Sequence, residues 1–153
     1  MIRIAIITNL VAYSIVASQP LAYIVVMSSA QRALSAPAYI ELRQRINPLM
    51  SRRLPAIYLG ALVVALSLIV ASARFANWNV LVTTTIAFLC LVMDVILMMR
   101  ENLPINAVID RWSPTNYPED WEGYRTKWFA IFAYRQVVLL LGFFSLLVGA
   151  AFQ

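Results

Sequence analysis

Histidine is missing from this sequence, and cysteine occurs only at Cys90. The chain therefore lacks the commonest metal ligand and the side chain that most often transfers protons near neutral pH. It also cannot form an intrachain disulfide. Di-iron bundle sites and serine–histidine–aspartate triads both require histidine, so both are excluded. The four glycines form no phosphate-binding or dinucleotide-binding motif. We expect no metal site and no cofactor.

Charged residues are also scarce, at 12% of the 153 residues, whereas 62% are hydrophobic. Soluble domains have about 25% charged and roughly 45–50% apolar residues. A chain of this length cannot hide so much apolar surface inside a soluble fold, so most of its solvent must be lipid. The net charge of +5 arises from basic residues at the ends of hydrophobic segments. Cations contact lipid headgroups there, and a nucleic-acid partner is not expected.

Four hydrophobic segments reach the length of about 20 residues that a membrane-spanning helix requires. They are residues 3–30, 54–73, 79–99 and 128–152. The sequence predicts an all-α bundle of four transmembrane helices in a single domain, residues 1–153. The first segment is longer than the apolar core of a signal peptide, so we expect it to be retained as a helix. The short link between the second and third segments predicts an antiparallel hairpin.

The first long connection, residues 31–53, is predicted to contain a short helix at the membrane interface. Ser35 is placed to cap its start, and Pro37 lies in its first turn, where a missing N–H has little cost. Apolar residues recur at helical spacing while Arg43 and Arg45 lie elsewhere, which is typical of an interfacial amphipathic helix. A solvated connector is the alternative. The apolar face consists of Leu34, Ala38, Leu42 and Leu49.

The second long connection, residues 101–128, contains three of the four tryptophans and is predicted to form a structured cap over one end of the bundle. Of the 12 basic residues, Arg3 and Arg74 belong to the end that holds both termini, and Arg135 lies inside a span. The other nine belong to the end with the long connections. By the positive-inside rule, we expect these connections in the cytoplasm and both termini outside, in a bacterial cytoplasmic membrane.

Two charged residues, Asp94 and Arg135, fall inside predicted spans. A charge near the bilayer centre costs about 2.5–3.5 kcal/mol even on the most lenient scale, so such residues usually pair or line a cavity. Their spacing from the segment ends places both about 9–10 Å below the same interface. Stripes of small residues on both helices also favour inward positions. The two side chains are predicted to meet, as a structural ion pair or as part of a catalytic or binding site.

The candidates for catalysis are Asp94, Arg135 and Glu101, because a carboxylate beside arginine in an apolar site can act as a base or anchor a polar group. In the first segment, Pro20 predicts a kink, since its missing N–H leaves the carbonyl of Val16 without a helical partner. Gln19 beside it is expected to face the interior. It serves there either as a packing residue or as part of a ligand pocket.

The segments ENLPINAVIDRW and DWEGYRTKWFAIFAYRQ together form one pattern. An acidic residue, Pro and Asn precede a Trp in the first segment, and Trp, Arg and Trp precede a helix that carries Arg in the second. The pattern resembles a family of small four-helix membrane proteins, mostly of unknown function, that includes the fungal anthrone oxygenases. The resemblance implies this fold and oxidation of polycyclic phenols without metal or flavin. Many members carry a His where this chain has Phe132, which implies a different route. The matching positions are Glu101, Pro104, Asn106, Trp112, Trp121, Arg125, Trp128 and Arg135.

Two functions from different classes fit these observations. The first is an enzyme or binding protein for a hydrophobic aromatic, quinone-like or lipid small molecule, which the resemblance favours. The second is a non-enzymatic accessory subunit of a larger membrane complex, packed against other subunits or copies of itself. A transporter or channel ranks last, because four helices are few for a pore. The ligand-binding candidates are Gln19, Asn106, Trp112, Trp121, Arg125 and Trp128.

A cavity distinguishes the first two functions. Binding of a small molecule predicts a cavity at the end with the long connections, with Asp94 or Arg135 exposed to it, and loss of binding without unfolding in Arg135→Ala. An accessory subunit predicts a bundle interior that is filled by side chains.

Overall fold

The computed structural model describes residues 2–152, apart from the side chains of Ile2 and of residues 19–22. The described residues form helices, with one isolated bridge between Ser113 and Asn116 in the last connection. The elements in order are α1 (Ile2–Ala22), the π-helical η1 (Tyr23–Met27), α2 (Ser28–Arg32), α3 (Ala36–Arg74), α4 (Trp78–Leu97), the π-helical η2 (Met98–Asn102), α5 (Leu103–Ile109) and α6 (Trp121–Ala151).

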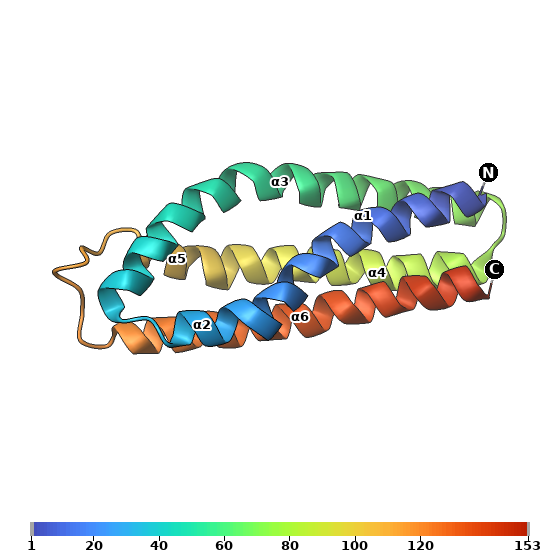
Figure 1. The fold of residues 1–153 in the computed structure, drawn as a ribbon. Coiled ribbons are helices and arrows are strands. Elements are labelled where there is room, and N and C mark those ends of the chain that lie inside the picture. The colour runs from blue at the N-terminus through green and yellow to red at the C-terminus, as the bar shows by residue number, and fades with distance from the viewer. Residues whose placement is uncertain (1, 153) are drawn as a thin grey trace.

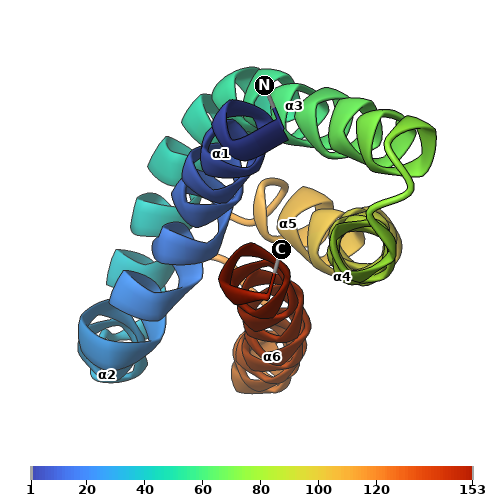
Figure 2. The same cartoon turned by 90° about the vertical axis from the view of Figure 1, so that its right-hand side faces the viewer.

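These elements join into four long helical runs that are long and apolar enough to cross a membrane. The runs are Arg3–Arg32, Ala36–Arg74, Trp78–Ile109 and Trp121–Ala151. They alternate in direction, so that both termini and the α3–α4 turn lie at one end (Figure 1), and the end-on view shows the four runs arranged around one axis (Figure 2). The predicted all-α four-helix bundle is confirmed, and its four spans make this a multi-pass membrane protein.

The first connection is much shorter than predicted. The expected helix begins at Ala36, after Ser35 at the N-cap position, whose side chain makes no capping hydrogen bond. The helix continues without a break into the second span, so only residues 33–35 separate α2 from α3. Buried residues form a stripe on one face of α3 in two stretches, residues 36–47 and 58–72, and they pack both ends of this helix against the bundle. The 39 residues of α3 extend about 58 Å, nearly twice the thickness of the hydrocarbon core. The stripe consists of Ala36, Tyr39, Ile40, Arg43, Asn47, Tyr58, Ala61, Ala65, Leu68 and Ser72.

The predicted orientation of this part of α3 is therefore wrong. Arg43 was expected away from the apolar face, yet its side chain points into the bundle and is only 3% exposed, whereas Leu49 is 57% exposed. Pro48 and Pro55 lie inside the helix, where each removes one helical hydrogen bond. Figure 1 shows α3 bowed along its length.

The third and fourth spans also extend further than predicted at this end. The third continues through η2 and α5 to Ile109, and α6 begins at Trp121 rather than Trp128, so the connection shrinks to residues 110–120. Packing stabilises these extensions, because Ile105 and Ile109 form a buried cluster with Tyr39, Trp128 and Phe129. In addition, Gln44 Nε2 donates to the carbonyl oxygens of Ile109 and Trp112 at 3.2 and 2.7 Å, which satisfies the end of α5.

Small residues bring α4, α6 and α1 close together, as the stripes in the sequence predict. A Cβ atom added to Gly149 would lie 2.0 Å from Thr83 Oγ1, and one added to Gly142 would lie 1.8 Å from Tyr13 Oη and 2.9 Å from Cys90 Cβ. Such close approach between helices is the usual role of small residues in membrane bundles.

Gly142→Ala is expected to lower the free energy of unfolding by about 1–3 kcal/mol, because the buried Tyr13 ring has no room to move. Gly60→Ala is the matched control, since a Cβ atom there meets nothing within 4 Å and alanine favours the helix. Reversible unfolding in mixed detergent micelles measures both. Equal stability of the two variants would contradict this packing.

Candidate functional site

The predicted ion pair between Asp94 and Arg135 forms in the interior of the bundle. Arg135 Nε donates to Asp94 Oδ1 at 2.7 Å, and Arg135 Nη2 donates to Asp94 Oδ2 at 3.0 Å. This two-pronged geometry is the strongest arrangement for an arginine and a carboxylate. Asp94 is fully buried. The matched depths that the sequence indicates for the two residues therefore do bring them together.

Two further side chains complete this polar cluster. Tyr58 Oη donates to Asp94 Oδ2 at 2.6 Å, and Arg135 Nη1 donates to Asn102 Oδ1 at 2.9 Å. Asp94 thus accepts three hydrogen bonds, which leaves it poorly placed to take a proton from a ligand. Arg135, in contrast, has one side on an adjacent cavity.

The cavity has a volume of about 500 Å³. It lies at the end of the bundle that holds the α2–α3 and α5–α6 connections. Small-molecule sites usually range over roughly 300–1,000 Å³ and combine an apolar lining with a few polar groups. Here the apolar part comes from α3, η2, α5 and α6, and the rim contains exposed residues of α3 and α5. The polar residues that line it are Arg43, Asn47, Ser51, Asn102, Asn106, Asp110 and Arg135, with the hydroxyl-bearing Tyr23 and Tyr58.

Three aromatic rings form one wall of the cavity. Trp128 and Phe132 stack with ring centroids 4.8 Å apart and an interplanar angle of 14°, and Tyr23 packs edge-on against Phe132 at 4.6 Å. Tyr23 begins the π-helical turn η1, three residues after Pro20. The sequence predicts the kink in the turn before Pro20, whereas α1 continues to Ala22. A wall of flat rings suits a flat apolar ligand.

Arg43 is the second cation of the cavity. Its guanidinium lies over the Trp128 ring, 4.1 Å from the centroid, and its Nη2 donates to Asn106 Oδ1 at 2.5 Å. Trp128 Nε1 donates to the same Asn106 oxygen at 2.9 Å. Arg43, Asn106 and Trp128 therefore hold one another in fixed positions from three different helices.

The structure gathers only some of the residues that the sequence singled out. Arg135, Asn106 and Trp128 line the cavity, and Asp94 lies directly behind Arg135. Glu101 does not line it, and it pairs with Lys127 at 3.5 Å. The side chain of Gln19 lies outside the described residues.

The remaining candidates, Trp112, Trp121 and Arg125, do not line the cavity and instead hold the connections together. Arg125 Nη1 donates to the carbonyl oxygens of Arg32 and Leu34, both at 3.1 Å, which fixes the α2–α3 turn to α6. Trp112 packs edge-on against Tyr124 at 5.2 Å. Their role in the structure is to stabilise the predicted cap.

Sequence reasoning missed Arg43, Asn47, Asn102 and Phe132 as cavity residues. A signal for Arg43 and Asn47 is present, since both continue the period of Ala36 and Ile40 on the buried stripe of α3. Pro48 and Pro55 hide this signal, because prolines inside a helical pattern usually indicate its end.

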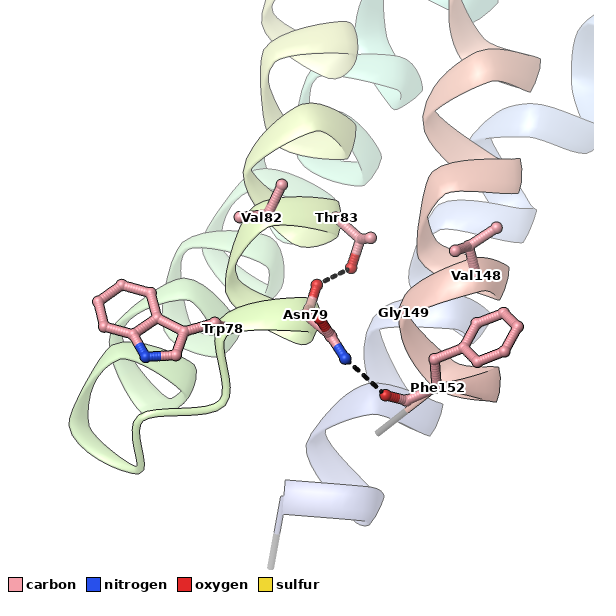
Figure 3. Close-up of a pocket in the computed structure, with 7 residues that line it drawn as sticks. All are labelled: Trp78, Asn79, Val82, Thr83, Val148, Gly149 and Phe152. Atoms are coloured by element: carbon pink, nitrogen blue, oxygen red, sulfur yellow. Dashed lines mark hydrogen bonds between the residues drawn. The ribbon is translucent and has the colours of Figure 1, made fainter.

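A second depression, of about 420 Å³, lies at the opposite end between α4 and α6 (Figure 3). Two of its polar side chains are already paired, since Asn79 Nδ2 donates to the carbonyl of Phe152 at 3.0 Å and Thr83 Oγ1 donates to that of Asn79 at 2.8 Å. The described residues that line it include no charged side chain. The cavity beside Arg43 and Arg135 is therefore the better candidate for a functional site.

Comparison with known proteins found no match for this chain among protein-family models, curated proteins or solved structures.

Proposed function

We propose that this membrane protein binds a hydrophobic aromatic, quinone-like or lipid small molecule in the cavity between α3, α5 and α6. The observation that carries the proposal is a cavity of about 500 Å³ that joins an aromatic wall to two buried arginines. Apolar pockets with a few convergent polar groups are the usual form of a ligand site. An accessory subunit would instead have a bundle interior filled by side chains at the position of this cavity.

Access from the bilayer supports a lipid-soluble ligand. The rim includes exposed side chains on two helices that flank the opening, Met50 and Pro55 on α3 and Leu103 on α5. A hydrophobic molecule dissolved in the membrane can enter there without crossing water. Because nine basic residues belong to this end, the positive-inside rule predicts an opening on the cytoplasmic side, with both termini outside.

The resemblance to the anthrone oxygenases extends the proposal to metal-free oxidation of the bound molecule. Phe132, which stands where many members carry a His, lines the cavity and stacks on Trp128. A route that uses that His is closed to this chain. Binding is therefore the part of the proposed function that the cavity supports best.

Ala107→Trp is expected to abolish ligand binding without unfolding the protein. Ala107 is an exposed residue on the cavity rim, so the indole would fill the opening without disturbing the core. Binding of 2-naphthoate and of its uncharged analogue 2-naphthalenemethanol is measured by calorimetry in phosphatidylcholine nanodiscs, with empty nanodiscs as background. Native mass spectrometry of protein extracted in its own lipid detects any ligand that copurifies.

The matched control is Ala130→Trp, because Ala130 is exposed on α6 and does not line the cavity. Saturable binding that Ala107→Trp removes and Ala130→Trp preserves supports the proposal. If neither probe binds and nothing copurifies, or if Ala107→Trp binds as the parent does, the cavity is not a ligand site and the accessory-subunit function gains support.

A further inference from the structure

We infer that the ligand carries an anionic oxygen, a carboxylate, phenolate or phosphate on an apolar body, and that Arg43 is the residue that pairs with it. The inference rests on the proposed function and narrows its ligand class. It comes from the mismatch between how deeply Arg43 is buried and how incompletely its charge is compensated.

Arg43 has no carboxylate partner among the residues that the structure describes. The ion pairs among residues 2–152 join Arg125 to Glu122, Lys127 to Glu101 and Arg135 to Asp94. Asp110 is the acidic residue in the cavity lining, and its Oδ1 accepts a hydrogen bond from Asn47 at 2.7 Å instead. A side chain that is only 3% exposed thus carries a positive charge without an ion-pair partner among the described residues.

The hydrogen-bonding capacity of Arg43 is also only partly used. Its Nη2 donates to Asn106, but its Nε is buried without a hydrogen-bond partner. An unsatisfied buried donor and an unpaired buried charge both destabilise a fold. Ligand pockets use a few buried polar or charged groups of this kind to orient the bound molecule.

The position of Arg43 indicates what kind of molecule brings the anion. Its guanidinium is fixed on the Trp128 ring and faces the cavity next to the wall formed by Tyr23 and Phe132. It precedes Leu54, where the predicted hydrophobic span begins, by about 16 Å along the helix, outside the hydrocarbon core on the side of the long connections. The site therefore fits an amphiphile whose anion contacts Arg43 while its apolar body lies against the three rings.

The test compares the two naphthalene probes, which share a ring system and differ in charge. In the parent protein, 2-naphthoate is expected to bind at least about tenfold more tightly than 2-naphthalenemethanol, because a charge-assisted pair is roughly twice as strong as a neutral hydrogen bond. Arg43→Met should lower the affinity for naphthoate to that for the alcohol. Arg43→Lys, which keeps the charge and loses the planar fork, should retain part of the preference.

Stability separates this role from a structural one. Without ligand, Arg43→Met is expected to keep the melting temperature within about 3 °C of the parent, since removal of an unpaired buried charge offsets the lost contacts. A large fall in melting temperature together with an unchanged naphthoate preference would overturn the inference. Equal affinity of the parent for both probes would also overturn it, yet the proposed function would stand if Ala107→Trp still blocked binding.

The source of the anion is distinguished by a second arm of the same experiment. Nanodiscs that contain phosphatidylglycerol should weaken naphthoate binding if the natural anion is a lipid phosphate, because the lipid then competes for Arg43. Unchanged binding in those nanodiscs assigns the site to a free carboxylate or phenolate.

Discussion

Arg135→Gln is expected to lower the free energy of unfolding by about 3–5 kcal/mol, because it leaves a buried carboxylate without its counter-charge. Asp94 is fully buried, and Arg135 supplies two of the three hydrogen bonds that it accepts. Only the bond from Tyr58 would remain. This expectation differs from the one drawn from sequence alone, in which loss of Arg135 impairs binding but not folding.

A double-mutant cycle measures the pair itself. Asp94→Asn alone leaves Arg135 as an unpaired buried cation and should destabilise by a comparable amount. In the double variant Asp94→Asn/Arg135→Gln both partners are neutral, so its loss of stability should be clearly smaller than the sum of the two single losses. Additive losses, measured by reversible unfolding in mixed micelles, would show that the two side chains do not interact.

Asn106→Leu is expected to destabilise the protein by about 2–5 kcal/mol, because two buried donors lose their acceptor at once. Asn106 Oδ1 accepts from Arg43 Nη2 at 2.5 Å and from Trp128 Nε1 at 2.9 Å. Leucine has a similar volume but no acceptor, so the effect reports the lost hydrogen bonds rather than a cavity. Thermal unfolding in nanodiscs measures it, and a melting temperature equal to that of the parent would refute the role of Asn106.

Asn106→Asp is the informative control for that variant. It preserves both hydrogen bonds and places a carboxylate against Arg43, so the protein should be at least as stable as the parent. The same carboxylate neutralises the charge of Arg43, so the preference for 2-naphthoate over 2-naphthalenemethanol should disappear. A variant that is stable and still prefers naphthoate would show that Arg43 does not select the anion.

Some features of the site follow from the sequence because they depend on position along a helix. The depth of Asp94 and Arg135 in their spans can be calculated from residue spacing alone, and the pair forms as that calculation predicts. The helical period of the small residues likewise predicts the close packing at Gly142 and Gly149. Neither inference needs knowledge of how the other helices are arranged.

The composition determined by itself that lipid is the main solvent, and the lengths of the apolar segments determined that four helices cross it. Only the tertiary structure decided which polar residues share the cavity. Arg43 and Asn106 are 63 residues apart in sequence. The pattern of each helix taken alone allows its side chain to face either the lipid headgroups or the bundle interior. Contact with helices elsewhere in the chain makes that choice, because Asn106 and the Trp128 ring are the groups that contact the buried Arg43 guanidinium.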